Sequence, residues 1–133
     1  MLCRTSNAGA EDFQQLRFLT RGAKKRAVKY LYEIVAEKAL SWQCGLVVGA
    51  TSDAIKRIVK ITKNQLPFLI PGIGAQGGDL EMILKAIKEN ISIHRINASS
   101  SLAYAYEKQG GNAADAALKE AKKLNEKIGE YYG

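Results

Sequence analysis

The chain has 133 residues, of which 47% are hydrophobic and 25% charged, and it carries a formal net charge of +7. This length suits one domain, no run approaches the roughly 18 consecutive apolar residues of a membrane span, and the N-terminus lacks the basic and apolar segments of a signal peptide. Two distant cysteines, Cys3 and Cys44, and a single histidine, His94, argue against a disulfide framework, a histidine metal cluster and a Ser/His/Asp triad. We therefore expect a single cytoplasmic domain over residues 1–133, with reduced thiols, no metal and no membrane contact.

The basic residues gather early in the chain, at Arg17, Arg21, Lys24, Lys25, Arg26 and Lys29. Such a cluster can contact nucleic acid. It can also be the solvated face of a helix beside a site for an anionic small molecule. We favour the second interpretation, with no nucleic-acid partner, because aromatic residues do not interleave with these charges in a stacking pattern.

The first half of the chain predicts two strands and two helices. Residues 1–7 are interpreted as the end of a strand that leads into a loop. Residues 23–41 are predicted to be helical, since apolar residues recur there at helical spacing: Val28, Leu31, Ile34, Val35 and Ala39. Residues 46–48 form a β-branched run closed by Gly49, and Ser52 or Thr51 can cap a helix whose inner side carries Ala54, Ile55, Ile58, Val59 and Thr62.

The second half repeats this alternation. A strand is predicted over residues 68–70, ending at Pro71, because proline cannot donate to a sheet ladder. Asp79 is expected to cap or open a helix with Leu80, Ile83, Leu84 and Ile87 on one face. The segment "ISIHRINASSS" is a further strand candidate, and a last helix is predicted from about residue 112 to 128.

Short apolar strands that alternate with amphipathic helices predict an α/β fold with a parallel sheet and right-handed crossovers. Four βα units fit this length, whereas a complete (β/α)8 barrel needs about 250 residues. The pattern alone therefore leaves two architectures open, a small open α/β domain and half of a TIM-type barrel.

Three polar loops follow predicted strands: "RTSNAG", "PGIGAQGGD" and "NASSS". Ligands of parallel α/β folds meet the loops at the carboxyl ends of the strands. Glycine lets backbone N–H groups approach a ligand closely, and successive N–H groups at a helix start bind anions such as phosphate. A glycine-rich loop can also be plain turn chemistry and a serine run a helix cap, but a turn does not require the amide of Gln76.

The segments "RTSNAGAEDFQ", "GLVVGAT" and "FLIPGIGAQGGD" resemble the orotidine 5′-phosphate decarboxylases, in the subgroup with motifs R-T-S-N-P-G, V-V-G-A-T and P-G-I-G-A-Q-G-G-D. The resemblance runs from about residue 3 to residue 128. It implies a phosphate-binding TIM barrel that acts as a dimer and removes CO2 from orotidine monophosphate (OMP) to give UMP without a cofactor. By this analogy the chain spans strand 5 through helix 8.

The same resemblance implies which residues bind substrate. Ser6 matches the hydroxyl that hydrogen-bonds the pyrimidine, and Gln76 matches the glutamine that reaches the phosphate and touches that serine. The run "NASSS" matches the last phosphate loop, where backbone N–H groups and an arginine hold the phosphate. The implied substrate-binding residues are Ser6, Asn7, Pro71, Gly74, Gln76, Ser99 and Ser100.

The chain departs from the family pattern in three places. Nothing in it reproduces the Asp-x-Lys-x-x-Asp motif, whose lysine stabilises and protonates the carbanion formed as CO2 leaves. Ser100 stands where the phosphate arginine is expected, with Arg95 a doubtful substitute inside a strand, and Ala8 replaces the usual proline. We therefore expect no catalytic residue in this chain, and either self-association or pairing with a missing N-terminal half. The alternative is a non-catalytic half-barrel that binds a phosphorylated ligand or only assembles.

Overall fold

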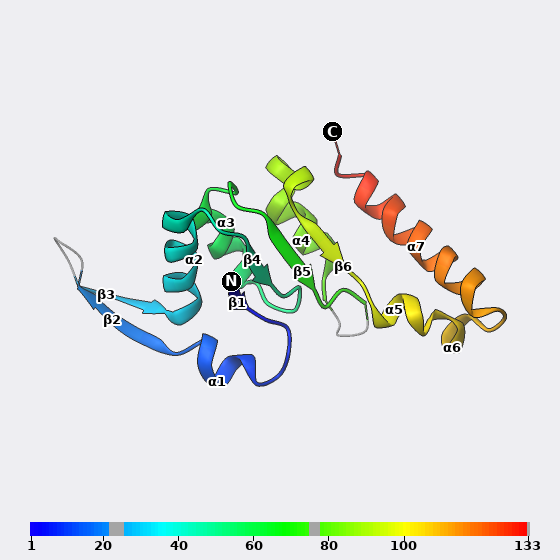
Figure 1. Ribbon diagram of the computed structural model, residues 1–133, viewed down its shortest axis with the longest axis horizontal. Coiled ribbons are helices and arrows are strands. Elements are labelled where there is room, and N and C mark those ends of the chain that lie inside the picture. Colours follow the sequence, from blue (N-terminus) through cyan, green and yellow to red (C-terminus); the bar gives the residue numbers. More distant parts are fainter. Residues whose placement is uncertain (22–25, 75–77, 133) are drawn as a thin grey trace.

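The computed structural model describes residues 1–21, 26–74 and 78–132. Its centre is a four-stranded sheet, which consists of β1 (Leu2–Arg4), β4 (Leu46–Val48), β5 (Phe68–Pro71) and β6 (Arg95–Asn97) (Figure 1). All three neighbouring pairs are parallel, and the spatial order β1-β4-β5-β6 follows the chain. A doubly wound sheet reverses its strand order, whereas a barrel adds each strand beside the last. The order is therefore that of half a barrel, as one of the two sequence interpretations predicts.

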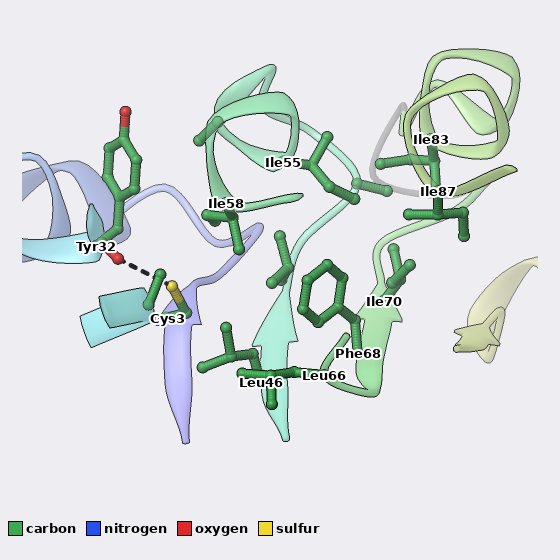
Figure 2. Close-up of a cluster of buried hydrophobic side chains, with 14 of the residues drawn as sticks. Cys3, Tyr32, Leu46, Ile55, Ile58, Leu66, Phe68, Ile70, Ile83 and Ile87 are labelled. Atoms are coloured by element: carbon green, nitrogen blue, oxygen red, sulfur yellow. Dashed lines mark hydrogen bonds between the residues drawn. The ribbon is translucent and has the colours of Figure 1, made fainter. Parts of the chain in front are cut away.

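One face of this sheet is covered by α2 (Leu31–Trp42), α3 (Ala54–Thr62) and α4 (Leu80–Ile87). Figure 2 shows α3 and α4 above the sheet, with Ile55 and Ile83 pointing down towards Phe68 and Ile70 of β5. These four side chains are at most 1% exposed. Burying such side chains is the main stabilising contribution to the fold, at about 1.5–3 kcal/mol each.

The helix starts predicted at Ser52 and Asp79 are confirmed by hydrogen bonds to these side chains, and the start of the last helix, predicted at about residue 112, has such a bond as well. Ser52 Oγ accepts from the N–H of Ala54 (3.2 Å), and Asp79 Oδ1 accepts from Met82 (2.9 Å). Asn112 Oδ1 accepts from Ala114 (2.8 Å) at the start of α7 (Ala113–Gly129). Each side chain supplies an acceptor to one of the N–H groups that a helix start leaves unpaired.

The helix predicted over residues 23–41 is wrong in its first part. Instead, β2 (Arg17–Arg21) and β3 (Arg26–Tyr30) pair antiparallel as a hairpin, which Figure 1 shows projecting beyond α2. Val28, predicted on the inner helix face, pairs with Leu19 and is 64% exposed. The helix begins only at Leu31, where the N–H of Tyr30 donates to Glu33 Oε2 at 2.9 Å and closes the first turn.

The basic cluster is consequently not the face of a helix. Arg17 and Lys29 belong to the hairpin, where Arg17 lies 5.4 Å from the centre of the Tyr30 ring and Lys29 forms an ion pair with Glu37. Lys24 and Lys25 lie outside the described residues. Val28 and Leu31 are three residues apart, which fits a helix, but Val28 belongs to β3 and Leu31 begins α2.

The strand predicted over "ISIHRINASSS" is also too long. Its first residues belong to a 3-10 helix, η1 (Lys88–Ile93), and the serines begin α5 (Ser100–Ala103), so β6 keeps three residues. His94 explains the late start, because its ring binds the turn after α3: Nδ1 accepts from Phe68 N (3.2 Å) and Nε2 donates to Asn64 Oδ1 (2.8 Å). His94 therefore has a structural role beside the strand.

Two smaller elements complete the description. Helix α1 (Ala10–Gln14) follows the first loop, and α6 (Ala105–Gln109) joins α5 to α7. At the end of β5 the strand includes Pro71 itself, opposite Asn97, and does not stop before it as predicted. Within residues 1–21, 26–74 and 78–132, the helices are too short or too polar to cross a membrane.

Candidate functional site

The four parallel strands end at Arg4, Val48, Pro71 and Asn97, so the loops that follow them start at one edge of the sheet. This is the edge at which ligands of parallel α/β folds bind. Three of the loops are those predicted to bind substrate. The fourth, "GAT" after β4, turns out to connect them.

The first loop is held by side chains on both sides of Thr5. The N–H of Thr5 donates to Gln14 Oε1 at 2.7 Å, and the carbonyl of Thr5 accepts from Arg4 Nη1 at 2.9 Å. The Thr5 hydroxyl donates to Asn7 Oδ1 at 2.5 Å, and the Asn7 carbonyl accepts from Ala10 N at 3.0 Å. Ser6 is half-buried within this arrangement and Asn7 is exposed.

Gly49 brings the loop after β4 against the first loop. Its N–H donates to the carbonyl of Arg4 at 2.5 Å, and a Cβ built on it would lie 2.5 Å from the backbone nitrogen of Ser6. That separation is below any normal van der Waals contact, so only glycine fits between β4 and Ser6. The two loops are therefore in direct backbone contact.

Ala50 makes the next link, to the glycine-rich loop. Its N–H donates to the carbonyl of Pro71 at 2.9 Å, and its carbonyl accepts from Asp79 N at 3.3 Å. A Cβ on Gly78 would lie 2.7 Å from the Ala50 side chain and 2.5 Å from the carbonyl oxygen of Gly72. Both ends of the loop between β5 and α4 are thus fixed against the "GAT" segment.

Gly74 links the glycine-rich loop to the serine run. It has φ +85° and is exposed, and a Cβ at this position would lie 2.7 Å from Ser101 Cβ and 2.9 Å from Ser101 Oγ. Ser99 and Ser100, also exposed, stand at the start of α5, where Ser99 O accepts from Leu102 N at 3.1 Å. Six of the seven predicted binding residues therefore occupy loops or strand ends joined in one series of contacts.

The seventh, Gln76, lies outside the described residues, and so does its predicted contact with Ser6. The described residues on either side, Gly74 and Gly78, place the ends of its segment beside Ser101 and Ala50. The loop that carries Gln76 therefore starts and ends at the same edge of the sheet as Ser6.

Arg95 is not directed to this edge. Its Nη1 donates to the carbonyls of Ser92 (3.1 Å) and His94 (2.8 Å), which precede β6. The guanidinium thus folds back towards the amino end of the strand, away from Ser99 and Ser100. The doubt about Arg95 as the phosphate-binding arginine is supported by this geometry.

The two strongly shifted titratable groups belong to the core. Burial lowers the pKa of His94 to about 4, and burial raises the pKa of the Cys3 thiol to about 12. Cys3 Sγ donates to the carbonyl of Tyr32 at 3.2 Å (Figure 2). Among the residues placed by the structure, no group of three or more histidines, cysteines and carboxylates is arranged to hold a metal ion. The edge loops offer hydroxyls, amides and backbone N–H groups, which suit binding and not proton transfer.

Sequence reasoning missed three residues that contribute to the edge. The sequence predicts Gly49 only as the residue that closes a strand, and Ala50 only as part of the segment "GLVVGAT", although a glycine directly after a buried strand is a signal of close backbone approach. Gln14 ends the quoted segment "RTSNAGAEDFQ", but no role is predicted for it, because its partner Thr5 is nine residues away across a loop.

No family model matches the chain, but individual relatives do. A protein of Dehalococcoides mccartyi strain 195 is 40% identical over 98% of this chain, and one of Halobacterium salinarum is 36% identical over 98%. Both relatives are orotidine 5′-phosphate decarboxylases. The chain spans 48% of the length of each, about half of the protein.

Solved decarboxylase structures have the same fold. The OMP decarboxylase of Leishmania donovani matches with a TM-score of 0.66 and 34% identity, over 96% of this chain and 46% of its own. A putative decarboxylase of Toxoplasma gondii matches with a TM-score of 0.70 and 25% identity, over 98% of this chain and 50% of its own. These matches confirm the fold class, half of a TIM-type α/β barrel, and agree with a C-terminal fragment of an OMP decarboxylase.

Proposed function

We propose that this chain is the C-terminal half of an OMP decarboxylase and supplies the recognition of pyrimidine and phosphate. In this proposal Ser6 and Asn7 contact the base, and the phosphate is bound by Gln76 and by backbone N–H groups next to Gly74 and at Ser99 and Ser100. Pro71 shapes the start of the phosphate loop. The chain is a single cytoplasmic domain that needs no cofactor.

The observation that carries this proposal is the series of contacts at the sheet edge. Gly49 meets Ser6, Ala50 meets Pro71, and Gly74 meets Ser101, so the segments proposed for base and phosphate share one edge of the sheet. The relatives that match 98% of this chain are OMP decarboxylases. A nucleoside monophosphate has a base at one end and an anionic phosphate at the other. The loop with Ser6 and Asn7 offers side-chain groups for a base, and the glycine-rich loop and the serine run offer N–H groups for an anion.

Turnover by this chain alone should be nil. The motif that carries the family's catalytic lysine is missing from the sequence, and the described edge loops carry no substitute for its ammonium group. Decarboxylation leaves a carbanion that a positioned cation must stabilise and protonate. The N-terminal half of the barrel would supply this group, and OMP would bind between the two halves.

The uncovered sheet face supports a partner. Leu2 and Leu69 alternate with the core-facing residues of their strands and are 67% and 45% exposed. In a complete barrel such side chains are packed in the interior. A complementary half or a second copy of this chain would cover them and pair with the free strand edges.

The decisive test is complementation. The chain is mixed with a separately produced N-terminal half of a relative, and conversion of OMP to UMP is measured. We expect activity only in the mixture. A Ser6→Ala chain should lower the activity about tenfold. Ser41→Ala should leave it unchanged, because Ser41 is exposed and its hydroxyl donates to the Lys38 carbonyl of the same helix, α2. A folded mixture without activity contradicts the split-enzyme proposal.

One observation favours a second candidate, a non-catalytic half-barrel that binds a phosphorylated ligand or only assembles. Ser100 replaces the phosphate arginine, and the geometry of Arg95 offers no replacement. The missing charged contact should weaken phosphate binding by about 1.5–3 kcal/mol. Calorimetry with UMP and with inorganic phosphate separates the two: binding of phosphate as tight as or tighter than that of UMP favours the second candidate.

A further inference from the structure

Gln14 of α1 holds the backbone next to Ser6. Its Oε1 lies 2.7 Å from the N–H of Thr5, and its Nε2 lies 3.2 Å from Thr5 Oγ1. A backbone N–H can only donate, so the nearer amide atom must be the oxygen, and Nε2 is left to donate to the threonine hydroxyl. The two bonds fix both the peptide and the side chain of Thr5.

The hydrogen-bond directions continue from Thr5 into the loop. Because Thr5 Oγ1 accepts from Gln14, its own proton is directed to Asn7 Oδ1, at 2.5 Å. This relay satisfies the oxygen of Asn7 and leaves its amide nitrogen as the group that can donate to a ligand. Gln14 therefore orients residues on both sides of Ser6.

The other sides of the same peptide are also fixed. Arg4, 5% exposed, donates from Nη1 to the Thr5 carbonyl at 2.9 Å, and the backbone of Gly49 lies against the nitrogen of Ser6. Arg4 is the last residue of β1, and Gly49 directly follows β4. Gln14, which ends the short helix α1, is the third residue that holds this backbone.

We propose that Gln14 is a positioning residue that fixes Ser6 for hydrogen bonding to a pyrimidine, an inference that rests on the proposed function of Ser6. A hydroxyl selects one base over other ligands when its backbone is held in place. The two hydrogen bonds from Gln14 to Thr5 hold the backbone next to Ser6 and so fix the position of the Ser6 hydroxyl. Gln14 itself does not contact the nucleotide.

The test compares two adjacent glutamines in the 133-residue chain, Gln14 at the end of α1 and Gln15 directly after it. Gln14→Met removes both bonds to Thr5 while keeping the length of the side chain, and Gln14→Glu keeps an acceptor for the Thr5 N–H. Gln15→Met is the matched control, because Gln15 is exposed and its side chain donates to Glu11 of α1 and not to the first loop. Binding of UMP and of inorganic phosphate is measured by calorimetry, and amide hydrogen exchange at Thr5 and Ser6 by NMR.

We expect Gln14→Met to weaken UMP binding by about five- to tenfold and to speed exchange at Thr5, with phosphate affinity unchanged. Gln14→Glu should restore UMP affinity to within about threefold, and Gln15→Met should behave as the unmodified chain. Equal loss of UMP and phosphate affinity in Gln14→Met would mean general unfolding and would overturn the inference. Equal UMP affinities of Gln14→Met and Gln15→Met would also overturn the inference. In that case, UMP binding by the unmodified chain would still support the proposed function. If the unmodified chain prefers phosphate to UMP, the proposed function fails, and the role of Gln14 in base recognition fails with it.

Discussion

The two faces of the four-stranded sheet differ in how completely they are packed. On the helix-covered face, Ile70 and Val48 are fully buried beneath α3 and α4. On the opposite face, Leu69, the immediate neighbour of Ile70, is 45% exposed, and Leu2 is 67% exposed. The same short strands thus have one face that is packed against helices and one face whose side chains remain exposed.

This difference indicates that the covered face stabilises the chain and that the open face is available for a partner. The covered face holds the loops in place, since α3 and α4 both begin in the loops at the sheet edge. The open face contributes little to folding of the isolated chain but has the composition of a barrel interior. Substitutions on the two faces should therefore have separable effects.

The largest expected effect comes from paired substitutions of neighbouring residues. Ile70→Ala should lower the free energy of unfolding by about 2–5 kcal/mol, because it leaves a cavity in the core. Leu69→Ala should cost below about 1 kcal/mol, because that side chain is already half in water. Urea unfolding followed by circular dichroism measures both. Equal losses would show that the open face is covered in solution.

Acid should destabilise the covered layer through His94. Burial holds the pKa of the folded-state imidazole at about 4, below its ordinary value of 6.5. The unfolded chain therefore takes up this proton first as the pH falls. The resulting stability is fully present above pH 6.5 and is lost between pH 6.5 and pH 4, by at most about 3 kcal/mol.

A His94→Gln chain isolates this contribution. Glutamine can accept from Phe68 N and donate to Asn64 but does not titrate in this range, so its unfolding free energy should fall less between pH 6.5 and 4. Urea unfolding at a series of pH values measures the difference. Parallel curves for the two chains would show that His94 takes up its proton equally in both states.

The open face can be tested by charge. If copies of the chain associate through it, Leu69→Lys should weaken self-association by about tenfold, since a charge then has to be desolvated. Leu118→Lys is the control, because Leu118 is 54% exposed and belongs to α7, not to a strand of the sheet. Sedimentation equilibrium measures both. A self-association constant that is unaffected by Leu69→Lys would show that copies of the chain contact each other through another surface.

The smallest expected effect concerns α7, which lies at the periphery of the sheet (Figure 1). Asn112→Ala removes the acceptor of Ala114 N and should cost about 1 kcal/mol. Asn125→Ala, at an exposed position inside the same helix, should be neutral or slightly stabilising. Thermal unfolding measures both. A loss from Asn112→Ala above about 2 kcal/mol would mean that α7 is integral to the core.

Much of the fold could be predicted from local patterns. The apolar spacing of α3 and α4, the caps at Ser52 and Asp79 and the start of α7 near residue 112 each depend on residues within a few positions of one another, and each is confirmed. The hairpin and the short β6 could not be predicted in this way. Val28 fits a helical period equally well, and the start of β6 depends on His94 reaching Asn64, 30 residues away.

The sequence by itself determined the alternation of strands and helices and the three polar loops, because turn residues, caps and apolar periods act over short distances. Only the tertiary structure decided the strand order, the contact of Gly49 with Ser6 and the clamp of Gln14 on Thr5. These features depend on separations of 2.5–3 Å between segments far apart in the chain, and no local pattern encodes such distances.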